Sequence, residues 1–196
     1  MTDLLFEAGD GTTPIDEDEA DGLLPSWVRT RGDLNEAERN NILAARRSIR
    51  SATLADVLDD QWLRRLHEQM FGKVWSWAGR YRTTEKTIGI DPAEIAASMR
   101  SLTDDCQYWV EQDDTELVVA RFHHRLVAIH PFRNGNGRHA RAAADYLAGA
   151  FGMAPPTWGA NSGLDGPELR REYINALRTA DRDRDDLDAL INFIGS

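Results

Sequence analysis

A glycine-rich turn between two helical segments constrains the fold of this chain more than any other feature. The turn lies in the stretch HPFRNGNGR at residues 130–138, where Pro131, Gly135 and Gly137 interrupt an otherwise helical pattern. A residue that precedes proline is disfavoured in the α-helical region, so a helix that reaches His130 is expected to end there. The stretch predicts one helix over about residues 115–129, a short loop, and a second helix over about residues 137–151.

The rest of the chain also favours helices over strands. Apolar residues recur every four positions at Trp62, Leu66, Met70 and Val74, which indicates an amphipathic helix with one face in the core. Similar patterns predict further helices over about residues 33–50, 92–111, 166–180 and 184–194.

The N-terminal part of the chain differs in composition from the remainder. Residues 1–32 are acidic and contain several Gly, Thr and Pro residues, which is typical of an extended arm. Asp33 is the predicted N-cap of the first helix, with Glu36 completing a capping-box-like start. We expect residues 33–196 to form a single helical domain, long enough for one substantial core.

One segment between the predicted helices breaks the helical pattern. In AGRYRTTEKTIGIDP, at residues 78–92, Gly79, Gly89 and Pro92 flank a short β-branched run. This run is too short for a sheet of its own, so the segment is expected to form a hairpin or flap.

Charge is distributed unevenly along the chain. The net charge is −10, yet residues 117–144 contain no Asp or Glu and hold five arginines and four of the five histidines. An acidic chain is a poor partner for duplex DNA or an anionic membrane, so a small, local anion is the expected ligand. A basic helix face that only contacts water is the alternative interpretation of this window.

Cysteine content and the lengths of apolar runs indicate the compartment. Cys106 is the only cysteine, which excludes an internal disulfide, and it is expected to be packed in an apolar helix. The N-terminus has no secretion signal, and no apolar run approaches the length of a membrane span. These features predict a cytoplasmic protein.

The loop has the chemistry of a phosphate site. Gly135 and Gly137 place flexible backbone at a helix N-terminus, whose unpaired N–H groups and positive dipole end favour an anion. Arg138 and Arg141 are three residues apart, so both can reach the same anion from the first helical turn. His130 supplies an imidazole beside the loop that can act as a base.

These residues carry a resemblance to a known family. HPFRNGNGR followed by Arg141 resembles the signature of the Fic domain family, His-Pro-Phe-x-(Asp or Glu)-Gly-Asn-Gly-Arg-x-x-Arg. The upstream WSWAGRYRTTEKTIGI is similar to the family's Trp-Ala-Gly stretch and target-docking flap, so the similarity covers about residues 33–194. The chain most resembles the subgroup called mobile mystery protein B. The resemblance implies a mainly α fold, a single Fic-type helical domain with a short β-hairpin flap beside the active-site loop.

The resemblance also implies a protein adenylyltransferase. Such an enzyme moves AMP from ATP to a Ser, Thr or Tyr hydroxyl of a target protein, and pyrophosphate leaves with Mg²⁺. By position, His130 is the general base, Phe132 anchors the loop, and the nucleotide contacts fall to Gly135, Asn136, Gly137, Arg138 and Arg141. Transfer of this type needs mainly positioning and charge neutralisation. ATP and the target protein are the expected partners, with an antitoxin or a second copy of the chain as further candidates for a toxin-like or regulatory modifier.

One position departs from the family signature. Where the family has an acidic Mg²⁺ ligand, this chain has Asn134, whose neutral amide oxygen should hold a hard cation less well. Two alternatives therefore stand beside AMP transfer. One is a nucleotide-binding regulatory or interaction module without turnover, and the other is transfer of a different phosphate-containing group.

An inhibitory helix is implied by the resemblance alone. Many Fic proteins carry the pattern Ser/Thr-x-x-x-Glu-(Gly/Asn), whose Glu pairs with the last arginine of the signature. LNEAERNN places Glu38 in a similar setting, which implies an ion pair with Arg141. Leu34 replaces the Ser/Thr and Arg39 follows the glutamate, so a helical Glu in contact with water is the alternative.

The flap and three other features complete the candidate sites. The resemblance implies that the flap, through Thr84, Lys86, Thr87 and Ile88, pairs by backbone with an extended target segment, and an ordinary surface hairpin is the alternative. His123 and His124 are adjacent on a predicted helix, so they cannot form a metal-binding pair on one face. The acidic run at residues 181–186 lacks the Gly and Glu of a calcium loop and is expected to be a solvated turn.

Overall fold

The protein folds into helices joined by short loops. The computed structural model describes residues 21–183 and 186–196. Within these residues a 3-10 turn, η2 (Pro92–Glu94), leads directly into α5. The α-helices are α2 (Arg31–Ser48), α3 (Leu54–Val57), α4 (Asp60–Phe71), α5 (Ile95–Gln112), α6 (Thr115–Ile129), α7 (Asn136–Ala150), α8 (Gly166–Arg182) and α9 (Asp188–Gly195).

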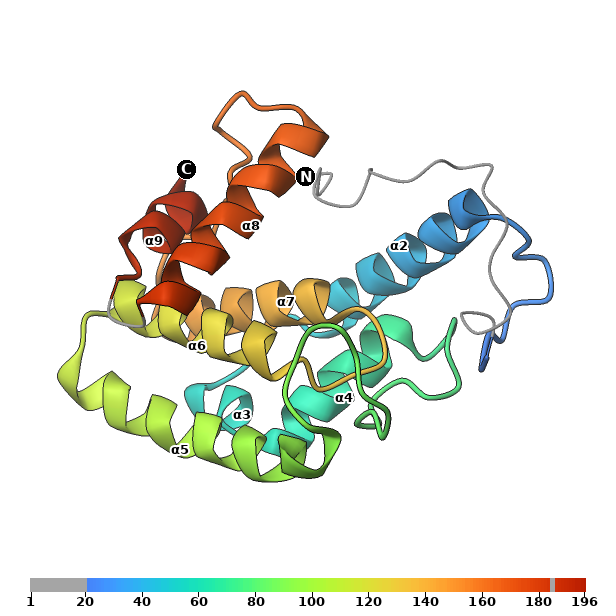
Figure 1. Ribbon diagram of the computed structural model, residues 1–196, viewed down its shortest axis with the longest axis horizontal. Helices are drawn as coiled ribbons and strands as arrows, with labels where there is room; N and C mark the ends of the chain where they lie inside the picture. The colour runs from blue at the N-terminus through green and yellow to red at the C-terminus, as the bar shows by residue number, and fades with distance from the viewer. Residues whose placement is uncertain (1–20, 184–185) are drawn as a thin grey trace.

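Helices α6 and α7 form the centre of the fold. Helix α6 packs against α7 on one side and α5 on another, while α2 packs against α4 and α8 against α9 (Figure 1). In Figure 1, α5 lies along one side of the central pair, and α8 and α9 lie along the other. The predicted mainly α fold is confirmed, and no described helix is long and apolar enough to cross a membrane.

Helix α7 is buried over almost its whole length, and most of its buried side chains are small. Alanine has the highest helix propensity and lets neighbouring helices approach closely. The fully buried alanines of this helix are Ala140, Ala142, Ala143, Ala144 and Ala148. Because α6, α4 and α3 all pack on this helix, its N-terminus has a fixed place in the molecule.

The start of α2 differs from the prediction. The N-cap is Thr30, whose side chain accepts a hydrogen bond from the Asp33 N–H, while the Asp33 carboxylate accepts one from the Thr30 N–H. Asp33 is therefore the third residue of the capping box, and its assignment as the N-cap was wrong. Both residue types cap helices well, and Thr30 comes first along the chain.

The structure describes only part of the predicted arm, and it does not confirm the predicted hairpin. Residues 1–20 of the predicted arm lie outside the described residues. The following segment lies against the end of α4, with one isolated bridge between Leu23 and Trp75 and a hydrogen bond of 2.8 Å from the Leu24 N–H to the Val74 carbonyl. No sheet occurs in the described part of the chain, so the β-hairpin of the flap is not confirmed and residues 79–91 form an irregular loop.

Candidate functional site

The loop between α6 and α7 begins with an unusual backbone conformation. His130 caps α6 in the left-handed region, with φ 53° and ψ 59°. The following Pro131 disfavours the right-handed helical conformation at this position, so the chain turns away from the helix here. A side chain in the left-handed region costs about 1–2 kcal/mol, so the surrounding contacts must hold it there.

Buried aromatic rings hold the loop from below. Phe132 is fully buried, which confirms its role as the loop's anchor, and it stacks on the His67 ring with 3.7 Å between ring centroids. The His67 Nδ1 accepts a hydrogen bond from the Gly79 N–H, so its Nε2 carries the proton and donates to the Asn134 carbonyl at 3.1 Å. Burial holds the pKa of His67 well below its ordinary value, so the ring is neutral. His67 was not among the predicted supports of the loop.

Asn136 closes the loop upon itself. Its Oδ1 accepts a hydrogen bond from the Phe132 N–H, and its Nδ2 donates to the Phe132 carbonyl, both at 2.8 Å. Because the buried amide group is used in this way, the Asn136 side chain shapes the loop, and the phosphate contact expected of it stays a prediction.

The N-terminus of α7 presents those N–H groups. Gly135 is the N-cap, with a positive φ of 78° and no side-chain cap. The first hydrogen bond that closes a turn runs from the His139 N–H to the Gly135 carbonyl, so the N–H groups of Asn136, Gly137 and Arg138 precede the helical ladder. Together with the positive end of the helix dipole, these N–H groups would favour an anion.

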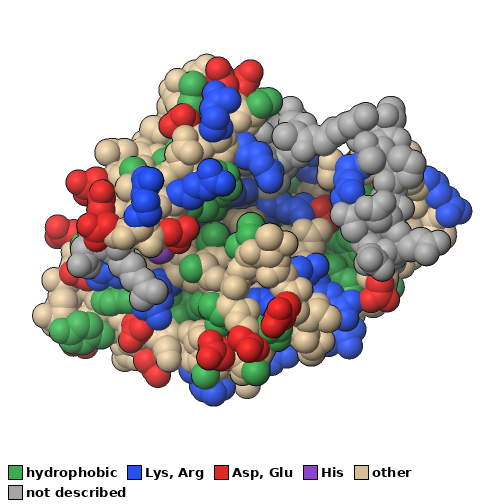
Figure 2. Space-filling view, viewed as in Figure 1, with side chains coloured by type: hydrophobic (Ala, Val, Ile, Leu, Met, Phe, Trp, Pro, Cys, Tyr) green, Lys and Arg blue, Asp and Glu red, His purple; other side chains and the backbone are tan. Residues whose placement is uncertain are grey.

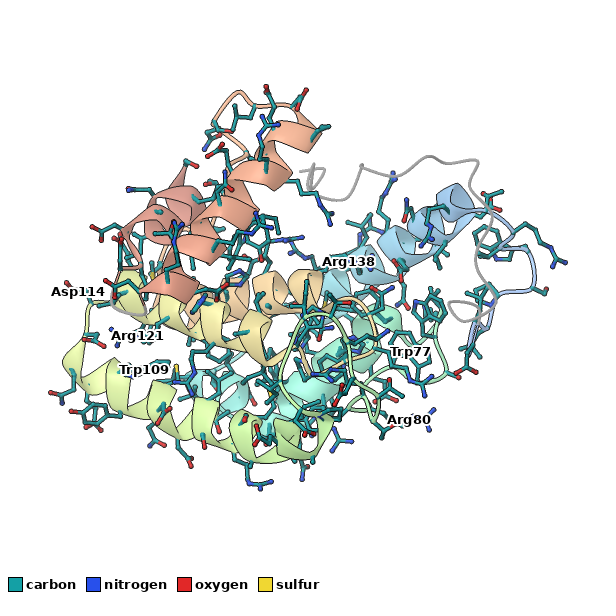
Figure 3. The ribbon with its side chains drawn as sticks, viewed as in Figure 1. Trp77, Arg80, Trp109, Asp114, Arg121 and Arg138 are labelled. Carbon is teal, nitrogen blue, oxygen red and sulfur yellow. The ribbon has the colours of Figure 1, made fainter. Side chains whose placement is uncertain are left out.

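Two arginines of α7 stand beside these N–H groups. Arg138 and Arg141 both line one large cleft, and their guanidinium carbons lie 4.8 Å from the Phe71 ring centre and 5.4 Å from the Tyr173 ring centre, respectively. Figure 3 shows Arg138 where α7 starts beside α2. The two arginines therefore face the same space, as their spacing predicted.

Glu38 of α2 reaches into the cleft from the opposite side. Its Oε2 lies 2.5 Å from the Arg138 Nη1 in an ion pair, and its Oε1 accepts a hydrogen bond of 2.7 Å from the Trp75 Nε1. The ion pair expected for Glu38 was with Arg141, and the structure gives it to Arg138, which lies one turn nearer the start of α7. The alternative of a glutamate in contact with water is wrong, because Glu38 is only 2% exposed.

Asn41 joins α2 to the end of α4 through two hydrogen bonds. The Asn41 Nδ2 donates to the Gln69 carbonyl at 2.7 Å, and its Oδ1 accepts from the Lys73 N–H at 2.8 Å. Asn41 thus joins α2 to the end of α4, one turn after Glu38.

The cleft has a volume of about 1140 Å³ and is walled by α2, the end of α6, the loop, the start of α7, and α8. Figure 2 shows a hollow between the α8 side and the α2 side, with blue arginine and lysine side chains gathered in it. The basic residues that line the cleft are Arg31, Arg39, Arg46, Arg138, Arg141, Arg170 and Arg178. The cleft around the signature loop is therefore basic, although the chain as a whole is acidic.

His130 also lines the cleft, and its environment favours the neutral imidazole. Burial lowers the pKa of His130 from its ordinary value of 6.5, the hydrogen bond with the Val127 carbonyl opposes this, and the nearby charges of Arg82 and Lys86 lower it further. Its Nδ1 lies 3.4 Å from that carbonyl, so the proton resides on Nδ1 and Nε2 keeps a lone pair. The ring can therefore accept a proton near neutral pH.

The residues present do not form a magnesium site by themselves. The Asn134 Oδ1 already accepts a hydrogen bond of 2.7 Å from the Gly135 N–H. Across residues 21–183 and 186–196, no group of three or more His, Cys, Asp or Glu side chains is placed to hold a metal. A magnesium ion here would take most of its ligands from the phosphates of a nucleotide and from water.

The flap residues lie at the edge of the site. Ile88 is 61% exposed and lines the cleft, while Thr84, Lys86 and Thr87 are exposed in the same loop. Arg82, which was not among the predicted site residues, joins this loop to His130 through a hydrogen bond of 2.8 Å from its Nε to the His130 carbonyl.

The remaining candidates have structural partners. The His123 Nε2 hydrogen-bonds with the Tyr173 hydroxyl at 2.9 Å, and the His124 Nε2 with the Asp181 carboxylate at 2.8 Å, so both histidines join α6 to α8. Cys106 is buried in α5, as expected, and burial raises the pKa of its thiol to about 12. Residues 184 and 185 of the acidic run lie outside the described residues.

Comparisons with known proteins agree with this geometry. The model of the Fic/DOC family matches residues 57–148. The chain is 30% identical over 115 residues to the protein adenylyltransferase Fic of Nematostella vectensis, and 29% identical over 112 residues to the protein adenylyltransferase fic-1 of Caenorhabditis elegans. These matches cover 54% and 53% of this chain, but only 25% and 20% of the two relatives.

Solved structures share the fold. BepC of Bartonella tribocorum, crystallised with AMPPNP, has a TM-score of 0.69 at 16% identity, with 92% of this chain and 97% of BepC covered. A Fic-1 fragment from Caenorhabditis elegans has a TM-score of 0.64 at 22% identity, with 92% of this chain and 54% of the fragment covered. The subgroup mobile mystery protein B stays a prediction.

The family match spans α4, the flap, the loop and the start of α7, whereas α2 and α8, which also wall the cleft, lie outside it. The curated relatives carry the names protein adenylyltransferase Fic and fic-1, and BepC shares the fold. Residues 57–148 of this chain are therefore identified as a Fic/DOC family match, so the chain carries a domain of that family.

Proposed function

We propose that this protein transfers AMP from ATP to a hydroxyl group of a target protein. The observation that carries the proposal is that one cleft is lined by the neutral imidazole of His130, the N-terminus of α7, and the side chains of Arg138 and Arg141. The names of the curated relatives, which are protein adenylyltransferases, and the AMPPNP bound in BepC support the same reaction class.

The reaction would use each part of the cleft for a separate task. The triphosphate lies against the N–H groups at the start of α7, with Arg138 and Arg141 neutralising its charge. The target's hydroxyl oxygen attacks the α-phosphorus while the His130 Nε2 takes its proton. The new bond joins that oxygen to the α-phosphorus, the bond to the bridging oxygen breaks, and pyrophosphate leaves. Bound Mg²⁺ would supply additional charge neutralisation to the phosphates.

The same cleft supports autoinhibition by α2. Arg138 is one of the two groups proposed to hold the outer phosphates, and the Glu38 carboxylate is paired with it. A phosphate group must displace this carboxylate before it can bind the Arg138 guanidinium, so Glu38 would act as a brake on nucleotide binding.

A second candidate function is nucleotide binding without turnover. It is favoured by Asn134, a neutral residue at the metal-ligand position whose amide oxygen is engaged by the Gly135 N–H. A module of this kind would bind nucleotide in the cleft but would not catalyse transfer.

One experiment separates these functions. The purified protein is incubated with Mg²⁺ and either α-labelled or γ-labelled ATP, alone and with cell lysate, and labelled proteins are identified by mass spectrometry. AMP transfer predicts label from the α position only, which His130→Ala abolishes while nucleotide binding stays. Label from the γ position alone would indicate a kinase and overturn the proposal, and binding without any label would support the module.

A further inference from the structure

Arg82 is a buried arginine whose positive charge faces carbonyl oxygens. It is 2% exposed, and its Nε donates to the His130 carbonyl at 2.8 Å. Its Nη1 donates to the Thr84 carbonyl at 3.0 Å, and its Nη2 to the Ile90 carbonyl at 2.5 Å. Burying a charge is costly unless it is fully hydrogen-bonded, so an arginine kept here indicates a specific task.

The three carbonyls belong to two different parts of the site. One is that of His130 itself, and the other two lie near the two ends of the flap, at Thr84 and Ile90. The backbone adds two more links between these parts, from the Arg82 N–H to the Pro131 carbonyl at 2.9 Å and from the Ile90 N–H to the Ile129 carbonyl at 3.4 Å. The side chain of Arg82 lies at the centre of this junction.

The packing at Gly89 shows how closely the two parts approach. A Cβ on this glycine would lie 2.6 Å from the Arg82 Nη2 and 2.7 Å from the His130 Cβ. Gly89 also has a positive φ of 110°, a conformation that side chains rarely adopt. The flap therefore touches the base of the His130 side chain directly, without room for a methyl group.

The fixed shape of the guanidinium suits this junction. Arginine offers five N–H donors in a rigid plane, so it can hold three carbonyls at set angles, whereas the ammonium group of lysine is a compact point charge. The His130 carbonyl also belongs to the residue in the left-handed conformation, which needs outside contacts to persist.

We propose that Arg82 is a positioning residue for the transfer reaction, which holds the His130 backbone and both ends of the flap in one fixed relation. This inference rests on the proposed function, because the flap would present the target's hydroxyl and His130 would take its proton. Arg82 would set the distance between them without touching either reacting group. The exposed flap residues between its two anchored ends would then be free to contact the target segment.

Arg82→Lys is the direct test, with Arg80→Lys as the matched control. Arg80 is exposed, and its Nη2 donates to the Ser76 carbonyl; Figure 3 labels it near Trp77. Self-modification is followed with α-labelled ATP, as the rate at saturating ATP and the ATP concentration for half the maximal rate. Exchange of the backbone amides of residues 83–90 with deuterium is measured on the same samples.

A displacement on the order of 1 Å at the reacting groups lowers a rate about a hundredfold, and that is the loss expected for Arg82→Lys at saturating ATP. The ATP concentration for half the maximal rate is expected to change by less than about twofold, because the phosphate contacts remain. The amides of residues 83–90 should exchange faster than in the unchanged chain, and Arg80→Lys should match the unchanged chain in all three measurements. An unchanged rate, or a loss explained by weaker ATP binding alone, would overturn the proposal.

Gly89→Ala supplies an independent variant that keeps Arg82, should Arg82→Lys fold poorly. The added methyl group separates the flap from His130, so the same loss at saturating ATP is expected. Its control is Gly163→Ala, which also has a positive φ, 75°, but no heavy atom within 4 Å of the added Cβ. Equal effects of the two alanines would show that backbone strain alone causes the loss, and the proposal would fall.

The role of Arg82 and the proposed transfer function can fail separately in these experiments. If the unchanged chain transfers no label to itself or to any lysate protein, the proposed function fails. Arg82 is then judged by amide exchange alone. Exchange at residues 83–90 that is the same in Arg82→Lys and in the unchanged chain would overturn its role as the link between flap and loop.

Discussion

The contact between Glu38 and Arg138 gives the sharpest prediction about regulation. Glu38→Gln removes the negative charge but keeps the side-chain volume and an oxygen that can accept from the Trp75 Nε1. The side chains of Glu38 and Arg138 are 3% and 16% exposed, so solvent screens their ion pair little. We expect the variant to bind ATP more tightly and to transfer AMP faster.

The size of the effect depends on the contact that the phosphates must displace. A hydrogen bond to a charged group contributes about 1.5–3 kcal/mol, and about 1.4 kcal/mol corresponds to a factor of ten in binding. Release of Arg138 should therefore lower the dissociation constant for ATP by roughly tenfold to a hundredfold. Glu38→Gly should release the arginine as well, but it leaves the Trp75 N–H without its acceptor and adds a glycine to α2, so its melting temperature should be lower.

The assay measures binding of a non-hydrolysable ATP analogue by calorimetry and self-modification with α-labelled ATP. Glu36→Gln is the matched control, because Glu36 lies on the same helix, is exposed and does not line the cleft. Binding and transfer that are equal in Glu38→Gln, Glu36→Gln and the unchanged chain would refute the brake.

Three further predictions concern the loop. Because burial lowers the pKa of His130, the base stays neutral at pH 7, and the transfer rate should fall to half only below pH 6.5; a midpoint above that value would contradict the assignment. Asn134→Asp adds a carboxylate at the metal-ligand position, so the Mg²⁺ concentration for half-maximal transfer should fall by about tenfold, and an unchanged Mg²⁺ titration would count against that role. Gly135→Ala would place a Cβ 2.5 Å from the Phe71 ring at a positive φ, so the melting temperature and the ATP affinity of this variant should both fall. The control is Gly149→Ala in α7, whose added Cβ would have no neighbouring heavy atom within 4 Å, and this variant should bind ATP as the unchanged chain does.

Local signals in the sequence predicted the helices and the loop well. The boundary between α6 and the loop agrees with the prediction because Pro131 acts on its immediate neighbour, and the effect needs no tertiary contact. The shared direction of Arg138 and Arg141 likewise follows from helical periodicity alone.

Local signals in the sequence did not predict the long-range contacts. Arg82 looks like any exposed arginine of a polar loop until the fold brings the carbonyls of His130 and Ile90 around it. Glu38 was singled out only through the family resemblance, and its choice between two arginines depends on how α2 sits on α4. The N-cap of α2 shows the same limit at short range, since Thr30 and Asp33 are both good caps and the sequence does not rank them.

The row of alanines along α7 has a consequence for how this molecule can change. The helix that presents its amides to the proposed ligand is buried over almost its whole length. Substitutions that enlarge its side chains should therefore displace the ligand site and destabilise the whole protein together. Helices α2 and α8 border the same cleft with larger and partly exposed side chains. Substitutions that change ligand preference, whether natural or made in the laboratory, should therefore occur in α2 and α8 more often than in α7.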